Sequence, residues 1–186
     1  VKVSVFISAL IIPSFLSLGK NIGQMVYGNA AAGIYLRAGA LIMFPMSISL
    51  ITTSMLNSLN LEKKTMLSFF AGAIPLLLCV YFLSPVVGVY SLITGLTLSY
   101  TITATINLIL IKKTCKVKPR YVDFIIASFV FLIPSTLFGY LLNNVLGAFM
   151  PYVLSTVIAA AAVTAFTYAF FTVFNLIDLK DLFKKA

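Results

Sequence analysis

The chain has 186 residues, of which 61% are hydrophobic and 9% charged, and its formal net charge is +9. A soluble domain carries about 25% charged residues, so this composition excludes a soluble globular domain and indicates a polytopic membrane protein. The basic residues sit in short gaps between apolar runs, so membrane topology explains the positive charge and we expect no nucleic-acid partner.

Six apolar runs are long enough to cross a bilayer as helices, since about 20 residues span the hydrocarbon core. They cover approximately residues 3–18, 33–64, 65–83, 86–111, 121–142 and 151–176. Between the runs we expect a polar loop over residues 19–33 and tight turns at Ser84-Pro85 and Asn143-Asn144. Pro45, Pro75 and Pro134 should kink their helices. The chain does not begin with Met, so we expect a fragment or a processed protein.

The lysines predict the topology. Going by turns, one side of the membrane receives only Lys20 and Arg37, and the other side receives Lys2, Lys63, Lys64, Lys112, Lys113, Lys116, Lys118, Arg120, Lys180, Lys184 and Lys185. Short loops rich in Lys and Arg remain in the cytoplasm, so both ends of the chain are predicted to be cytoplasmic. The basic loops and the tail should lie against anionic lipid headgroups.

Hydroxyl and amide side chains form polar faces on two of the predicted spans. In the second span they include Ser54 and Asn57, and in the fourth Ser99, Thr103 and Asn107 lie on one face. Two explanations stay open. Small and hydroxylated residues let membrane helices pack closely, and a dense polar face also suits the wall of a water-filled cavity.

Arg37 is the one charge that we place within reach of the bilayer. A charge inside a span is a functional hypothesis by default, but Arg37 lies only a few residues into its helix and can also extend its guanidinium to the outer interface. With the polar faces, this gives six candidate cavity-lining residues: Arg37, Ser54, Asn57, Ser99, Thr103 and Asn107.

The residue patterns of an enzyme are missing from the sequence. There is no His, and Cys79 and Cys115 lie in an apolar run and a basic loop, which is neither a disulfide framework nor a metal site. Paired carboxylates and glycine-rich phosphate loops are also missing. We therefore expect no catalysis, no cofactor and no metal.

One stretch resembles a known family. Residues 21–60 are similar to a recurring segment of the stage V sporulation protein B family, within the superfamily of multidrug, oligosaccharidyl-lipid and polysaccharide exporters. The features that carry the resemblance are Ile22, Gly23, Tyr27, Ala32, Gly33, Tyr35, Leu36, Arg37, Leu56, Leu59 and Asn60. Ser58 and Glu62 depart from it, because the family often has Gly and then Gln around this turn.

The resemblance implies an all-α flippase of about fourteen transmembrane helices, in which two lobes open alternately to each side of the membrane. Six spans would then be the last four helices of the second lobe, over residues 1–112, and the terminal pair, over residues 121–176. Residues 113–120 would form a basic cytoplasmic loop, and residues 177–186 an amphipathic cytoplasmic tail. The helices that precede this part would be missing N-terminal partners.

The function expected from the resemblance is transport. Such a protein would flip lipid-linked oligosaccharide or peptidoglycan precursor across the bacterial cytoplasmic membrane, by alternating access. Two alternatives remain open: a cation-coupled multidrug exporter of the same superfamily, and a non-transporting scaffold for cell-wall or spore assembly. The lack of an acidic residue deep in any span argues mildly against the exporter.

Overall fold

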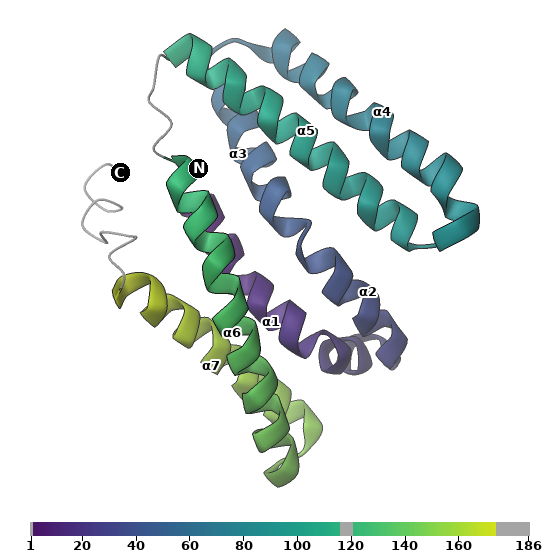
Figure 1. Cartoon of the computed structure of the whole chain (residues 1–186), viewed down its shortest axis with the longest axis vertical. Coiled ribbons are helices and arrows are strands. Elements are labelled where there is room, and N and C mark those ends of the chain that lie inside the picture. Colours follow the sequence, from purple (N-terminus) through teal and green to yellow (C-terminus); the bar gives the residue numbers. More distant parts are fainter. Residues whose placement is uncertain (1, 116–120, 174–186) are drawn as a thin grey trace. The chain divides into compact units, whose positions relative to one another are not determined.

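The computed structural model describes residues 2–115 and 121–173, and within these ranges it contains seven helices and no strand (Figure 1). They are α1 (Lys2–Tyr27), α2 (Ala30–Ala40), α3 (Met43–Ser58), α4 (Glu62–Val87), α5 (Tyr90–Cys115), α6 (Tyr121–Phe149) and α7 (Tyr152–Val173). The prediction of an all-α protein is confirmed. The tail at 177–186 and most of the basic loop lie outside the described residues.

Five of the described helices are long and apolar enough to cross a membrane by themselves: α1, α4, α5, α6 and α7. The short helices α2 and α3 reach the required length only as a pair, and a break of two residues separates them. The described part of the chain therefore supports a multi-pass membrane protein with five spans, or six where α2 and α3 together form one broken span.

The predicted positions of three connections between helices, one loop and two tight turns, are wrong. α1 continues as a helix through most of the predicted loop at residues 19–33, and the chain turns only at Gly28, whose φ is +64°. Ser84-Pro85 lies inside α4, which ends before Gly88 at φ +56°. Asn143-Asn144 lies inside α6. At Gly28 and Gly88 the backbone takes a left-handed conformation that glycine adopts without a steric penalty, and this fixes the true turn positions.

The helices form two compact units, and one of these units combines helices from the two ends of the described chain. α3, α4 and α5 belong to one unit, and α1, α2, α6 and α7 belong to the other. The boundary between them falls between Ala40 and Leu41, at the break between α2 and α3, and again after Arg120. We call them the three-helix unit and the four-helix unit.

In the three-helix unit, α4 and α5 form an antiparallel pair and α3 packs mainly on α5 (Figure 1). Close approach of α4 and α5 depends on Gly72, because a Cβ there would collide with the Thr103 hydroxyl and the Ser99 carbonyl. Most apolar side chains of α4 stay exposed, as expected for a helix that faces lipid or further helices.

In the four-helix unit, α1 is the central helix and contacts α2, α6 and α7. Its inward face includes Val5, Ile12 and Leu18, which are fully buried, and the rings of Phe6 and Phe171 meet edge to face at 5.3 Å. α1 and α2 form a hairpin whose backbones touch, because a Cβ on Gly33 would collide with the backbone of Gly19 and Lys20. Small residues that let helices touch are a common packing device in membranes.

Candidate functional site

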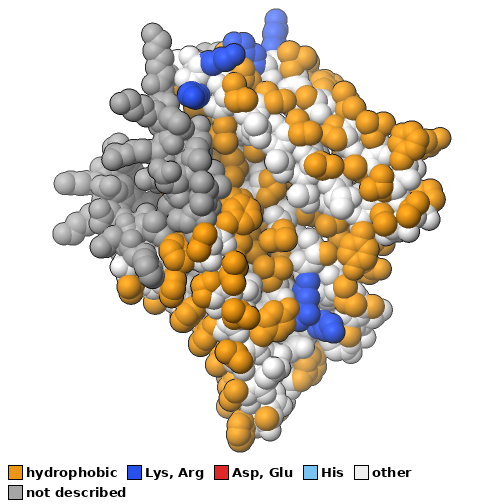
Figure 2. Space-filling view, in the orientation of Figure 1, with side chains coloured by type: hydrophobic (Ala, Val, Ile, Leu, Met, Phe, Trp, Pro, Cys, Tyr) orange, Lys and Arg blue, Asp and Glu red, His pale blue; other side chains and the backbone are white. Residues whose placement is uncertain are grey.

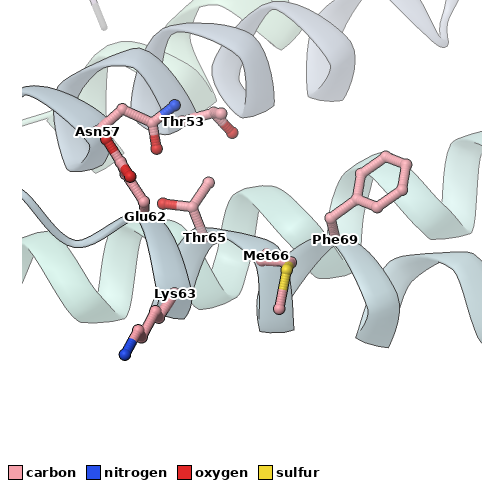
Figure 3. Close-up of a pocket in the computed structure, with 7 residues that line it drawn as sticks. All are labelled: Thr53, Asn57, Glu62, Lys63, Thr65, Met66 and Phe69. Atoms are coloured by element: carbon pink, nitrogen blue, oxygen red, sulfur yellow. The ribbon is translucent and has the colours of Figure 1, made fainter.

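A groove opens on the three-helix unit where α3 ends and α4 begins. Its volume is about 570 Å³, and its lining residues are Thr53, Asn57, Glu62, Lys63, Thr65, Met66 and Phe69 (Figure 3). The lining is polar at the turn between the helices and apolar further along α4. Glu62 and Asn57 point toward each other across the polar end (Figure 3).

The turn that builds the groove is a Schellman motif. Asn60 adopts a left-handed φ of 56°, which Asn tolerates better than most residues. The amide of Leu61 donates to the Leu56 carbonyl at 3.0 Å, and the amide of Asn60 donates to the Asn57 carbonyl at 3.0 Å. This motif closes α3 and starts α4 at Glu62, so the last turn of one helix faces the first turn of the next.

The polar end of the groove is connected to the buried side of α5. Asn107 is fully buried, and its Nδ2 donates to the hydroxyl of Thr53 at 3.0 Å and of Thr52 at 3.3 Å. Thr52 donates its own hydroxyl hydrogen to the Ile48 carbonyl at 2.7 Å. Thr53 accepts from Asn107, so its hydroxyl hydrogen remains available to the groove. The Oδ1 of Asn107 is buried without a hydrogen-bond partner.

Of the six candidate residues, five lie in the three-helix unit. Asn57 lines the groove and is exposed, and Ser54 is exposed on α3 and bonds to the Leu50 carbonyl at 3.1 Å. Thr103 is buried and donates to the Ser99 carbonyl at 2.9 Å. Ser99, Thr103 and Asn107 contact α4 or α3, so within this unit their contacts are those of helix packing.

Arg37, the sixth candidate, lies in the four-helix unit. Its Nη2 donates to the Ser17 carbonyl at 2.8 Å, and its guanidinium carbon lies 5.2 Å from the centre of the Tyr140 ring. The Tyr140 hydroxyl donates to the Leu16 carbonyl at 3.0 Å. Nε of Arg37 is buried without a partner. The half-buried guanidinium thus joins α1, α2 and α6. From the sequence, a role in lining a cavity and extension to the outer interface both stay open.

Sequence reasoning missed several residues at these places. Met66 and Phe69 look like ordinary lipid-facing residues in the sequence, and only the approach of α3 places them in a groove. In the sequence, Glu62 stands out only as a departure from the pattern of the family that residues 21–60 resemble, and nothing there marks it as a lining residue. Tyr140 follows Arg37 by more than a hundred residues, so no local spacing connects them.

The described residues contain no group of three or more His, Cys, Asp or Glu that would hold a metal ion. The groove instead offers one carboxylate, one ammonium, an amide and two hydroxyls beside an apolar floor, which suits binding of an amphiphile by charge and hydrogen bonding. No protein-family model, curated protein or solved structure matches this chain.

Proposed function

We propose that this chain is part of a transporter of the bacterial cytoplasmic membrane that flips a lipid-linked oligosaccharide or peptidoglycan precursor by alternating access. Its partners would be the lipid-linked sugar, anionic lipids at the basic loops, and further helices that precede this segment and complete the pathway. The likeness of residues 21–60 to the sporulation family of exporters supports this proposal, and no catalytic step is part of it.

The observation that carries the proposal is the break between α2 and α3. Pro45 has no N–H, so the Leu41 carbonyl lacks its usual helical partner and accepts a longer bond from the Phe44 amide at 3.4 Å. This weak point coincides with the boundary between the two compact units. Discontinuous transmembrane helices are typical of the substrate sites of transporters that work by alternating access.

The experiment compares Pro45→Ala with Pro75→Ala in the native protein, reconstituted into liposomes. A fluorescent lipid-linked oligosaccharide is added, and its transfer between leaflets is followed by chemical quenching from outside. Pro45→Ala restores an amide that can bond to the Leu41 carbonyl, so we expect several-fold slower transfer. Pro75 lies inside the continuous helix α4, so its replacement serves as the control. Equal rates for both variants would refute the role of the break.

A further inference from the structure

α4 is long and apolar enough to span a membrane, and its first turn, which forms one end of the groove, is charged, so we infer that the groove begins at headgroup depth. α4 begins and α5 ends on the same side of the three-helix unit, and that side bears the exposed lysines Lys63, Lys64, Lys112 and Lys113. Figure 2 shows basic side chains gathered at this end of the unit. Along α4, Phe69 follows Lys63 by six positions, which is a rise of about 9 Å. The headgroup layer on each side of a bilayer is about 5–8 Å thick, so the groove extends from headgroup depth to acyl-chain depth.

Both charges in the groove are without a partner in the described part of the protein. Glu62 and Lys63 follow each other in the first turn of α4, so their side chains diverge around the helix and do not face each other. Figure 3 shows Glu62 toward α3 and Lys63 away from it. A ligand that carries a negative and a positive group a few ångströms apart can pair with both.

Uncharged groups add hydrogen bonding between these charges. The amide of Asn57 offers an acceptor and two donors beside Glu62, and the hydroxyl of Thr53 is oriented by its bond from Asn107 at 3.0 Å. Thr65 donates to the Leu61 carbonyl at 3.2 Å and leaves its oxygen as an acceptor. Met66 and Phe69 are 56% and 64% exposed and continue the groove with apolar surface.

We propose that this groove binds a phospholipid whose headgroup carries a phosphate and a primary ammonium, with an acyl chain along Met66 and Phe69. The ammonium pairs with Glu62 and donates to the Asn57 amide oxygen, and the phosphate pairs with Lys63. An anionic headgroup without an ammonium meets the Glu62 carboxylate unfavourably. A quaternary ammonium lacks the hydrogens that Glu62 and Asn57 accept. The site does not depend on the transport proposal.

A carboxylate in the first turn of a helix also has a simpler role, because it stabilises the positive end of the helix dipole. That role predicts no preference among lipids. The test therefore measures lipid selectivity, which a purely structural Glu62 would not change.

These 186 residues contain no Trp, and the quenching of a tryptophan introduced here is measured as the difference from the parent protein. Phe69→Trp places it in the groove, and Phe70→Trp places it one residue further along α4, on a side chain that is similarly exposed but does not line the groove. Each variant is reconstituted in phosphatidylcholine vesicles that contain a minor fraction of brominated phosphatidylethanolamine, phosphatidylglycerol or phosphatidylcholine. Bromine quenches tryptophan on contact, so quenching reports which lipid occupies the site.

For Phe69→Trp we expect the ethanolamine lipid to be enriched about two- to fivefold over phosphatidylcholine, because both lipids keep the phosphate pair with Lys63 and only the exposed Glu62 pair discriminates between them. The enrichment over phosphatidylglycerol should be larger, since its anionic headgroup also meets the Glu62 carboxylate. Phe70→Trp should show no preference. Adding Glu62→Gln should remove the ethanolamine preference and favour phosphatidylglycerol, because Lys63 then acts alone. Adding Lys63→Gln should reduce quenching by all three lipids, while Glu62 still favours the ethanolamine lipid. Equal quenching by all three lipids at position 69, or a preference that survives Glu62→Gln, would overturn the proposal.

Discussion

Gly33→Ala tests the packing on which the four-helix unit depends. The added methyl group would collide with the carbonyl of Gly19 and with Cα of Lys20, which are backbone atoms that no rotamer change can move. α1 and α2 would have to separate by about 1 Å to reach ordinary van der Waals contact. The separation also lengthens the bond from Arg37 to the Ser17 carbonyl, which is now 2.8 Å.

The expected cost follows from these contacts. Overpacking of this kind costs about 1–3 kcal/mol, and a weakened interhelical hydrogen bond in a membrane adds roughly 0.6 kcal/mol. Gly39→Ala, in the same helix, is the matched control, because a Cβ at Gly39 meets nothing within 4 Å. Replacing a helical glycine there should gain about 0.5–1 kcal/mol. Gly33→Ala receives the same gain because Gly33 also lies in α2, so the two variants should differ by about 1.6–3.6 kcal/mol in the free energy of unfolding.

The assay is unfolding of the purified protein in mixed micelles with increasing SDS, followed by circular dichroism. Gly33→Ala should unfold at a lower SDS fraction than the native protein, and Gly39→Ala at the same or a higher one. Gly23→Ala is a second test, because its Cβ would collide with the backbone of Gly33 and Ala32. Equal midpoints for the substitutions at 33 and 39 would refute the close backbone packing of α1 on α2.

Three further predictions concern the other polar contacts and the topology. Asn107→Ala should destabilise the three-helix unit by about 1–2 kcal/mol in the same SDS assay, whereas Thr105→Ala should be nearly neutral, because Thr105 is exposed and bonds only to its own helix. Arg37→Lys should lower the free energy of unfolding by about 1 kcal/mol, since an ammonium cannot both stack on the Tyr140 ring and reach the Ser17 carbonyl. Substitution of the exposed Lys20 by Met is the control, and an equal effect of the two substitutions would contradict this prediction. Cys115 is exposed at the end of α5, so a membrane-impermeant maleimide should label it only after cells are permeabilised, and labelling of intact cells would reverse the predicted orientation.

Composition alone predicts the helical membrane class, because hydrophobic runs of this length have few other solutions in a bilayer. The ends of the helices are harder to predict. The stretch from Gly19 to Tyr27 looks like a polar loop, but it is helical, and its glycines allow α2 to pack closely against α1. Asn21 also donates to the side chain of Asn143 in α6 at 2.8 Å. Such pairing joins residues that are 122 positions apart, so no local pattern indicates it.

For the candidate residues, too, the sequence predicts the shared helix face but not the neighbouring helix that covers it. The sequence predicts that Ser99, Thr103 and Asn107 share a face of one helix, and all three do contact neighbouring helices in the three-helix unit. Helical periodicity cannot tell which neighbour covers such a face. Because α4 covers Thr103 and α3 covers Asn107, the open polar surface lies instead at Asn57 and Glu62.

We propose that the native protein moves a lipid-linked oligosaccharide across a bilayer. The most direct measurement is the transfer of a fluorescent undecaprenyl-pyrophosphate-linked sugar between the leaflets of liposomes that contain the purified protein, beside a fluorescent cationic drug and an ordinary phospholipid. We expect transfer of the lipid-linked sugar well above that in protein-free liposomes, with neither the drug nor the phospholipid accelerated. Transport of the drug alone, or no transfer of the sugar, would contradict it.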